Sequence, residues 1–377
     1  MALGASRRIL FISPYSVSFV RIRTKSNLEE YVLAGANVDL ICLSDEASYG
    51  EISGVNVIKQ IKNWSFILRL LRIVFGLFRL KPISYQYYNS FKLKPYLKSL
   101  DIQAYDLVHI ERLPIHEYGL NHQNIIFDCV DCFSDQTKKL SKTGGITSIL
   151  YFIDSLLLPR YERKICSRAR RVLVTTRNEK NKLIQLGVER EKIVSYIHRF
   201  QLQEVKRKED RSRPVFGFHG KLSYRPNIQA LGELNHLADL MSIDIKIAGP
   251  YSLDISHKFS ALTFLGYVDS LEDFFAQIDF GIFPITTCVG IQNKVLECLS
   301  SGTPVLITNQ IAESLDDLEN NSDIIIVNEL ENFEREINCL VERYNSNIDS
   351  LSAERAHNYS THLYVPNLFN IAFGVDR

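Results

Sequence analysis

Short apolar runs rich in β-branched residues alternate with longer amphipathic stretches along most of the chain. Runs of this length are typical of buried strands, and their alternation with helical stretches predicts layers of helices on parallel sheets. In the first half of the chain these runs are Arg8–Ser13, Val38–Leu43, Asp106–Glu111, Asn124–Cys129 and Arg171–Thr176. In the second half they are Val215–Gly220, Asp244–Gly249, Leu262–Gly266, Phe280–Ile285, Pro304–Thr308 and Asp323–Val327.

The stretch Gln201–Pro214, QLQEVKRKEDRSRP, separates the two series of strands. It is charged, nearly free of apolar residues and closed by a proline, so we interpret it as a linker. A chain of 377 residues also exceeds the usual size of one domain. We predict two doubly wound, Rossmann-like α/β domains that face each other across a cleft. The expected boundaries are residues 1–200, a linker at 201–214, a second domain at 215–355, and a helix within 356–377 that crosses back to the first domain.

The segment Trp64–Pro82 is too apolar for an ordinary surface helix. Arg69, Arg72 and Arg79 interrupt it, which argues against a span across a bilayer. On a helix these arginines share one face, opposite a continuous apolar face. Two interpretations stay open: a helix in a membrane interface with its arginines on lipid phosphates, or a core helix whose arginines extend to solvent.

Charge divides unequally between the two halves of the chain. Residues 1–199 hold 30 Lys and Arg against 18 Asp and Glu, and residues 200–377 hold 14 against 25. This asymmetry indicates that the first half faces an anionic surface, such as nucleic acid, anionic lipid or a phosphate-bearing acceptor. Two unequally charged solvated faces are the alternative. Hydrophobic residues at 46% and charged residues at 23% exclude a disordered chain.

Seven scattered cysteines indicate a reducing compartment, and we expect a cytoplasmic protein. The apolar run Ile9–Ile12 is too short for the core of a signal peptide. Cys129 and Cys132 form a single C-x-x-C motif without a second pair of ligands. We therefore expect no metal site.

The strongest chemical signal is GIQNKVLECLSSGTPVL, Gly290–Leu306. A glycine-containing loop leads into a helix that we place at about Gln292–Ser300. The free N–H groups and the positive end of the helix dipole at such a start favour a diphosphate. Glu297 lies one turn into the helix, where its carboxylate can accept hydrogen bonds from a ribose diol. The alternative is a surface carboxylate that complements the dipole.

A second signal is HGKLSYRPNIQAL, His219–Leu231. The chain leaves a strand through Gly220 and enters a helix near Pro226, a residue favoured at the first helical turn. Lys221 and Arg225 lie in the turn between them. Two cations at the carboxyl end of a strand can neutralise a pyrophosphate and stabilise it as a leaving group. Basic loop residues that are merely solvated are the alternative.

These two segments resemble the signature regions of the GT-B-fold glycosyltransferases of family 4, in group 1. More narrowly, the chain resembles bacterial sugar transferases of exopolysaccharide assembly. In the first half the resemblance depends on DLVHIER, FDCVDCFSDQ and YERKICSRARRVLVTTRNEK. It implies a nucleoside-diphosphate-sugar donor, a UDP- or GDP-sugar, on the second domain, and a glycan or lipid-linked acceptor on the first. It also implies retention of the anomeric configuration, no bound metal and no nucleic-acid partner.

Residues carry over from this resemblance by motif. Lys221 and Arg225 match the family's donor-phosphate binders, and Glu297 matches the second glutamate of its E-x7-E motif. Val289 stands where the first glutamate is expected, so the sugar contacts fall to the neighbouring backbone or to Asn293 and Lys294. The predicted donor site comprises Gly220, Lys221, Arg225, Gly290, Ile291, Gln292, Asn293, Lys294 and Glu297, with Arg21 reaching the phosphates across the cleft.

For catalysis we expect Asp128 or Asp131, which end a strand of the first domain. There the family often carries a histidine or an acid beside the reacting sugar. A carboxylate can orient the acceptor hydroxyl or stabilise positive charge at the sugar carbon. The alternative is that these acids cap the following helix. His109 and Glu111, at the end of another strand, are weaker acceptor-site candidates.

Two other classes of protein compete with a glycosyltransferase. A dehydrogenase is excluded because the first strand is followed by PYSVSFVR, which lacks the glycines of a dinucleotide-binding turn. A GT-B epimerase, or a catalytically silent nucleotide-sugar-binding protein, stays open because Val289 replaces a glutamate. We predict a sugar transferase of surface or exopolysaccharide synthesis that is peripheral at the inner face of the cytoplasmic membrane through residues 64–82.

Overall fold

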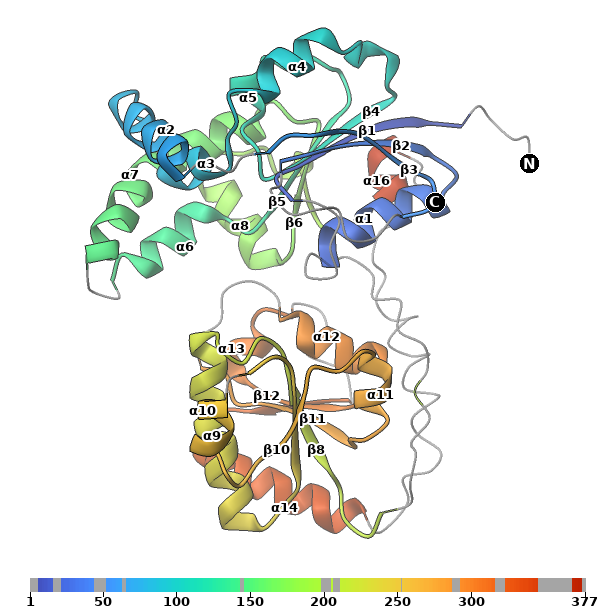
Figure 1. Cartoon of the computed structure of the whole chain (residues 1–377), viewed down its shortest axis with the longest axis vertical. Coiled ribbons are helices and arrows are strands. Elements are labelled where there is room, and N and C mark those ends of the chain that lie inside the picture. Colours follow the sequence, from blue (N-terminus) through green and yellow to red (C-terminus); the bar gives the residue numbers. More distant parts are fainter. Residues whose placement is uncertain are drawn as a thin grey trace. The chain divides into compact units, whose positions relative to one another are not determined.

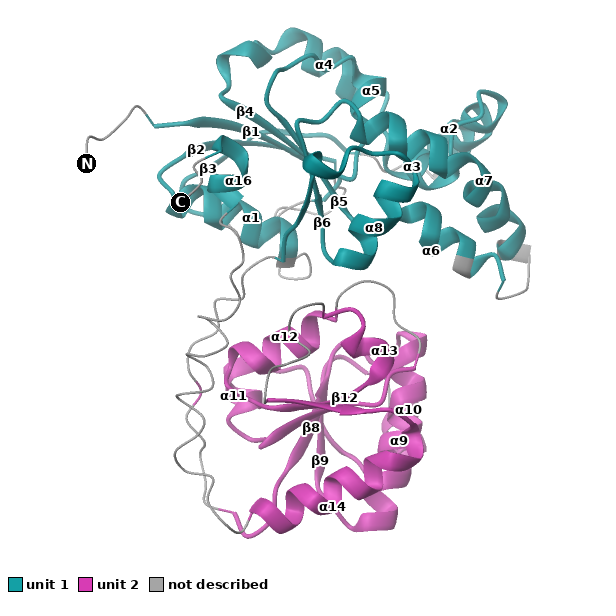
Figure 2. Cartoon of the chain, turned by 180° about the vertical axis from the view of Figure 1, so that it is seen from behind, with its two compact units in different colours: residues 1–199, 365–377 teal, residues 200–364 magenta. Residues whose placement is uncertain are grey.

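The computed structural model divides into two compact units, residues 1–199 with 365–377 and residues 200–364 (Figure 2). The structure describes residues 6–15, 22–43, 52–62, 66–142, 146–197, 205, 211–251, 253–286, 292–315, 323–344 and 368–374. Each unit is built around its own parallel sheet, and we describe the two separately.

The first unit contains a seven-stranded sheet in the order β3-β2-β1-β4-β5-β6-β7, with every neighbouring pair parallel (Figure 1). Its strands are β1 (Arg8–Ser13), β2 (Asn37–Cys42), β3 (Val55–Gln60), β4 (Leu107–Glu111), β5 (Ile125–Val130), β6 (Arg171–Val174) and β7 (Ile193–Ser195). The strand order reverses between β1 and β4. In open α/β sheets, ligands bind outside the carboxyl ends of the strands at such a reversal.

Helices cover both faces of this sheet, and apolar cores fill the space beneath them. The helices are α1 (Ile22–Leu33), α2 (Phe66–Phe78), α3 (Ile83–Tyr88), α4 (Leu93–Ser99), α5 (Ile115–Tyr118), α6 (Phe133–Leu140), α7 (Ile146–Cys166) and α8 (Arg177–Gln185). Short 3-10 turns occur at Ile102–Ala104 and Arg190–Lys192.

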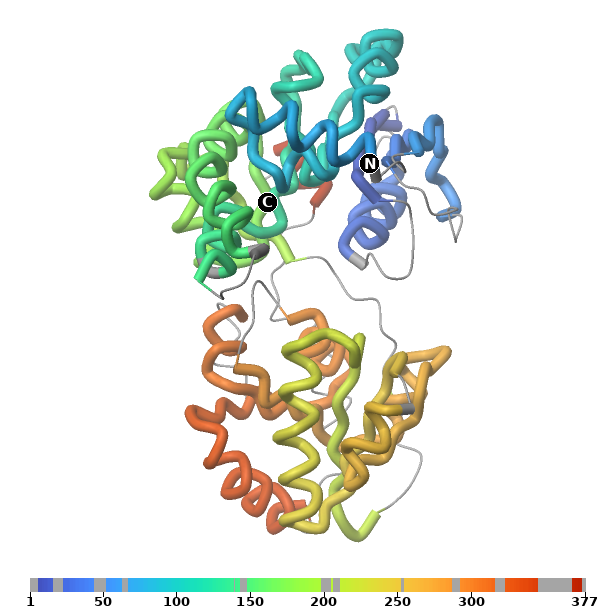
Figure 3. The backbone as a smooth tube through the Cα atoms, turned by 60° about the vertical axis from the view of Figure 1, so that its left-hand side comes forward, coloured from blue at the N-terminus to red at the C-terminus, as the bar shows by residue number. Residues whose placement is uncertain are grey.

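The terminal helix α16 (Leu368–Phe373) belongs to the first unit, where the tube drawing shows it in red (Figure 3). Its Leu368 N–H donates to Glu30 Oε1 at 2.5 Å, and Asn124 Nδ2 donates to the Ala372 carbonyl at 3.3 Å. Leu368 and Ala372 are fully buried against α1 and the sheet. The last described helix therefore completes the core of the unit that contains the first strand.

The second unit contains a six-stranded parallel sheet in the order β10-β9-β8-β11-β12-β13. Its strands are β8 (Phe216–His219), β9 (Ile245–Ala248), β10 (Thr263–Gly266), β11 (Phe280–Phe283), β12 (Val305–Thr308) and β13 (Ile324–Val327). Its helices are α9 (Arg225–Met241), α10 (Leu253–Lys258), α11 (Leu271–Phe275), α12 (Asn293–Ser300), α13 (Asn309–Ala312) and α14 (Phe333–Tyr344), with a 3-10 turn at Leu330–Asn332. The order reverses between β8 and β11, so the predicted α/β fold with two doubly wound sheets is confirmed.

Helix α2 is oriented with its polar face toward the protein. Arg72 is 4% exposed and donates to the backbone carbonyl of Asn89, and Arg69 donates to the Tyr87 hydroxyl at 3.2 Å. A Cβ on Gly76 would lie 2.6 Å from Cγ of a residue on α3, so the two helices approach closely there. The large exposed side chains of α2 are apolar: Ile67, Leu68, Leu70, Leu71, Val74, Phe75 and Phe78.

Both interpretations of the Trp64–Pro82 segment are therefore wrong about Arg72. This arginine neither reaches a lipid phosphate nor extends to solvent, because it is buried and bound to a backbone carbonyl. Within the described residues, no helix is both long and apolar enough to span a membrane.

Candidate functional site

Two glycines bring the loops after β8 and β9 into contact at the carboxyl end of the second sheet. Gly220 and Gly249 both have a φ of 135°, a conformation that other residues rarely adopt. The Gly220 N–H donates to the Ala248 carbonyl at 3.0 Å, and a Cβ on Gly249 would lie 2.0 Å from the Gly220 carbonyl oxygen. The loop that carries the predicted phosphate-binding residues is thus held directly against its neighbour.

Lys221 and Arg225 lie where the sequence predicts them, in the turn from β8 into α9. Both side chains are exposed, and Arg225 occupies the first position of α9 with Pro226 directly after it. Asn227 Nδ2 donates to the Lys221 carbonyl at 2.8 Å and fixes the turn. Neither cation forms an ion pair with a described residue, so both can bind an anion.

Lys294 lies in the first turn of α12 and contacts the same turn after β8. Its ammonium donates to Asn227 Oδ1 at 2.7 Å and lies 4.4 Å from the ring centre of Phe218. Loss of hydration lowers the pKa of Lys294 to about 8, although the charge of Glu297 acts in the opposite direction. Within the described part of the chain, this ammonium has an amide and an aromatic ring as close partners and no carboxylate.

Glu297 is buried and is bound to a histidine. Its Oε2 lies 2.7 Å from Nε2 of His219, the last residue of β8. The His219 ring packs against Phe274, Phe275 and Phe283, and its Nδ1 has no hydrogen-bond partner among the described residues. No local pattern pairs these two residues, because 78 positions separate them in the chain.

Part of the predicted donor site lies outside the described residues. This applies to Gly290, Ile291 and Arg21, and to the departure from the family motif at Val289. Gln292 and Asn293 are described: Gln292 precedes the first residue of α12, and Asn293 is that residue. The structure thus brings together the Gly220 loop, Lys221, Arg225, Lys294 and Glu297 around one end of the second sheet.

Asp128, the first of the two predicted catalytic acids, is an internal ion-pair partner. It is fully buried at the end of β5, where Arg23 Nε and Nη2 each donate to it at 2.8 Å and Asn27 donates at 3.1 Å. Burial would raise the pKa of Asp128, but the Arg23 guanidinium outweighs this effect and holds the pKa well below its usual value. Asp128 has no exposed surface with which to contact an acceptor.

Asp131 is the more accessible of the two acids. It forms an ion pair with Arg112 at 2.8 Å, and both side chains are partly exposed. Arg112 and Val130 adopt left-handed backbone conformations, with φ of 52° and 62°, and the register between β5 and β6 shifts between Asp128 and Val130. Such a conformation costs on the order of 1–3 kcal/mol and is concentrated at functional sites.

The alternative prediction, that these aspartates cap the next helix, is wrong. The N-terminus of α6 is capped by Glu162, which accepts from the Phe133 N–H at 2.7 Å. Glu179 accepts from the neighbouring Cys132 N–H at 2.7 Å. Both carboxylates come from helices later in the chain.

His109 and Glu111, the weaker acceptor-site candidates, lie inside the first unit. His109 Nδ1 lies 2.9 Å from the Tyr31 hydroxyl. Glu111 accepts from Ser13 at 2.7 Å and from Thr24 at 2.8 Å, and burial together with the charge of Asp128 raises its pKa. Both residues are buried, so neither offers a side chain for contact with an acceptor.

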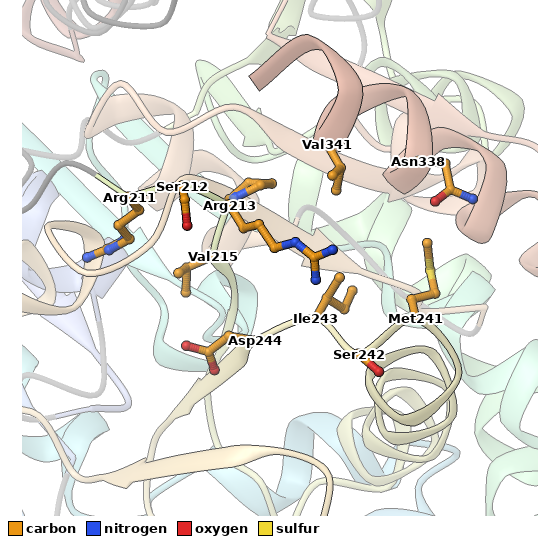
Figure 4. A pocket seen from close by; sticks show the side chains of 11 residues that line it. Arg211, Ser212, Arg213, Val215, Met241, Ser242, Ile243, Asp244, Asn338 and Val341 are labelled. Atoms are coloured by element: carbon orange, nitrogen blue, oxygen red, sulfur yellow. The ribbon is translucent and has the colours of Figure 1, made fainter. Parts of the chain in front are cut away.

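A cavity of about 510 Å³ lies elsewhere in the second unit (Figure 4). Val215, which directly precedes β8, and Asp244, which precedes β9, both line it. The cavity therefore lies at the amino end of the sheet, opposite Lys221 and Lys294. Among the residues that the structure describes, no three His, Cys, Asp or Glu side chains are placed to hold a metal ion.

Comparison with known proteins identifies the class of this fold and site. Residues 213–343 match the family model described as "Glycosyl transferases group 1". Alr3699/HepE from Anabaena, solved in complex with UDP, is 12% identical with a TM-score of 0.61, and the match covers 98% of each chain. WaaG, "a glycosyltransferase involved in lipopolysaccharide biosynthesis", is 14% identical with a TM-score of 0.59, over 97% of this chain and 98% of that one. TarM is 10% identical with a TM-score of 0.65, over 98% of each chain.

A search of curated proteins finds no match to this sequence. The fold is that of the two-domain GT-B glycosyltransferases. The chain is a glycosyltransferase, and its residues 213–343 form a group 1 glycosyl transferase domain. This domain contains the two segments on which the resemblance in the sequence depends.

The Arg23–Asp128 pair predicts a large loss of stability when it is broken. Asp128→Ala leaves a buried guanidinium without its counter-charge, so we expect the free energy of unfolding to fall by about 3–5 kcal/mol. Arg7→Ala removes an exposed pair with Asp106 and should cost less than about 1 kcal/mol. Urea unfolding of both variants measures the difference, and equal losses would contradict the role assigned to Asp128.

The contact between Gly249 and Gly220 predicts opposite effects for two glycine substitutions. Gly249→Ala places a methyl group against a backbone carbonyl at a left-handed position, so we expect it to lower the free energy of unfolding by at least about 1 kcal/mol. Gly232 lies within α9, and a Cβ added there would have no heavy atom within 4 Å, so Gly232→Ala should raise the free energy of unfolding by about 0.5–1 kcal/mol. Thermal or urea unfolding of the two variants measures these changes. An unchanged free energy of unfolding in Gly249→Ala would show that the two loops do not touch.

Proposed function

We propose that this glycosyltransferase transfers a sugar from a nucleoside diphosphate to a hydroxyl of a glycan or lipid-linked acceptor. The second unit binds the donor and the first unit binds the acceptor. The observation that carries the proposal is the group of three cations, Lys221, Arg225 and Lys294, at the carboxyl end of the second sheet beside the first turn of α12.

A diphosphate matches the charge of this group. Lys294 lies near the positive end of the α12 dipole, an unfavourable place for a cation unless an anion lies beside it. Its pKa is already lowered to about 8, first of all by loss of hydration. A diphosphate between Lys294 and the exposed Lys221 and Arg225 supplies the missing negative charge, and the same cations stabilise it as a leaving group.

Glu297 is proposed to hold the ribose. His219 occupies its Oε2, which fixes the direction of the carboxylate. In the proposal Oε1 accepts from a ribose hydroxyl, and His219 is the positioning residue behind it. This role agrees with the motif position of Glu297 in the family that the sequence resembles.

UDP is the nucleotide to test first, ahead of GDP. Alr3699/HepE, which shares the fold, was solved with UDP and with UDP-glucose. The sugar contacts are proposed to come from Gln292, Asn293 and Lys294 and from the backbone of Gly290 and Ile291. On the acceptor side we propose Asp131 as the catalytic acid, because it combines exposure with the strained backbone beside it.

Surface-glycan synthesis at the membrane is the proposed biological setting. Family 4 membership, retention of the anomeric configuration and a role in exopolysaccharide or other surface-glycan synthesis follow from the resemblance in the sequence motifs. WaaG, with the same fold, is described as acting in lipopolysaccharide biosynthesis. We propose a cytoplasmic enzyme that works against the membrane, where lipid-linked acceptors lie, through residues 64–82.

Replacement of either Lys294 or Lys221 should weaken nucleotide binding strongly. Wild-type protein is expected to melt at a higher temperature with UDP, because a ligand of the native state stabilises it by mass action. Lys294→Met and Lys221→Ala should each remove most of that increase while the protein stays folded. Lys258→Ala, on α10 of the same unit, is the matched control and should keep it. Full UDP stabilisation in both site variants would overturn the donor-site assignment.

The lowered pKa of Lys294 predicts a pH dependence for UDP binding. The charged ammonium binds the diphosphate, so affinity should be greatest below about pH 8 and fall as the pH rises through this value. Bound diphosphate stabilises the charged form, so binding should also take up protons in this range. Calorimetry in buffers of different ionisation enthalpy measures the uptake. Lys294→Arg stays charged, so its affinity should not fall with pH; a fall equal to the wild type's would assign the titration to another group.

A further inference from the structure

The outward face of α2 is apolar over the whole length of the helix. Phe75 is 59% exposed and Phe78 is 85% exposed, and five more large apolar side chains of the helix are also exposed. A monomeric soluble protein rarely presents a continuous apolar surface of this kind without a partner. Helix α2 lies at the edge of the first unit beside α3, as Figures 1 and 2 both show.

Specific polar contacts hold α2 in this orientation. Its inner face provides Arg69, Arg72 and the close approach at Gly76, all of which contact α3 or the residues just after it. Helix α3 in turn is fixed by Asp154 of α7, which accepts from the Ile83 N–H at 2.5 Å and from the Ser84 N–H at 2.8 Å. Rotation of α2 to bury its apolar face would leave the Asn89 carbonyl without its donor and move Arg72 out of its site.

The turn after α2 extends the apolar surface. Leu80 is 74% exposed and adopts a left-handed conformation with a φ of 53°. Glycine is the usual residue at this position after a helix, because a side chain there is strained. A large apolar residue at this place adds to the exposed surface at the expense of local stability.

A second apolar stripe lies on α7. Ile149, Phe152 and Leu156 are exposed and recur at helical spacing, while Asp154 of the same helix is buried in its contact with α3. The two helices that carry exposed apolar faces are therefore joined through α3.

Charge identifies the chemistry of the partner. Residues 52–100 contain nine lysines and arginines and no aspartate or glutamate. Lys62, Arg79, Lys92 and Lys94 of this segment are exposed. A surface that is both apolar and cationic matches a bilayer with anionic headgroups. It does not match a second copy of itself, because two such segments would repel each other.

We infer that α2 is a monotopic membrane anchor, with its apolar face in the interface of an anionic bilayer and its arginine face bound to the protein. The exposed lysines and Arg79 contact the lipid phosphates. This inference rests on the proposed function only for the purpose of the anchor, namely access to a lipid-linked acceptor.

Vesicle flotation of the full chain tests the inference. Wild-type protein should bind vesicles that contain phosphatidylglycerol and bind phosphatidylcholine vesicles much less. The double variant Phe75→Ser/Phe78→Ser should bind the anionic vesicles at least about tenfold more weakly, because it loses two inserted side chains. Lys92→Gln/Lys94→Gln should weaken binding to anionic vesicles and reduce its dependence on salt.

The control is Leu33→Ser/Leu240→Ser, which removes exposed apolar side chains from α1 and α9 and should bind like the wild type. Equal flotation of wild type and Phe75→Ser/Phe78→Ser would overturn the inference. So would a wild-type dimer in solution that becomes monomeric in this variant. UDP stabilisation, measured on the same samples, should be unchanged in all of them; its absence in the wild type would count against the donor site and leave the anchor to be judged by flotation.

Discussion

A charge that leaves water needs an opposite charge or a set of hydrogen bonds, and this constraint organises both units. In the first unit Arg23 and Asp128 satisfy each other and join α1 to the end of β5. Arg72 is satisfied by a backbone carbonyl, and this contact decides which face of α2 points outward. In the second unit the Lys294 ammonium contacts an amide and two aromatic rings; it forms no ion pair with a described residue, although the charge of Glu297 acts on it. The same physical requirement that stabilises the first two sites is the basis on which the third is proposed to bind an anion.

The carboxyl ends of the two sheets are built differently. At the first, the acids Asp128 and Glu111 are buried in a polar interior, and Asp131 is partly exposed. At the second, glycines let two loops touch and the cations are exposed or only partly covered. Exposed cations at the end of a sheet suit a ligand of negative charge. This difference agrees with the proposed roles, in which the second unit binds the donor and the first binds the acceptor.

The alternation of strands and helices predicted the fold class, because buried parallel strands leave an apolar run that can be recognised locally. Lys221, Arg225 and Glu297 could be predicted to lie at one end of the second sheet, because each lies near a glycine or a helix start. The pairing of Glu297 with His219, the burial of Asp128 and the orientation of α2 were not found, since each depends on residues far away in sequence. The spacing of arginines along a helical sequence is the same whether they face solvent, lipid or the protein interior.

The position of α16 affects the order in which the apolar cores of the two units can form during translation. The first unit is synthesised first, yet the side chains that cover Leu28 and Tyr31 on its α1 face include Leu368 and Ala372, which are synthesised only after the whole second unit. In the sequence, all residues of the second unit lie between these two parts of the first. During translation the second unit can therefore acquire its complete core while the first is still open along α1. A nascent chain therefore has a complete second unit before the core of its first unit is closed.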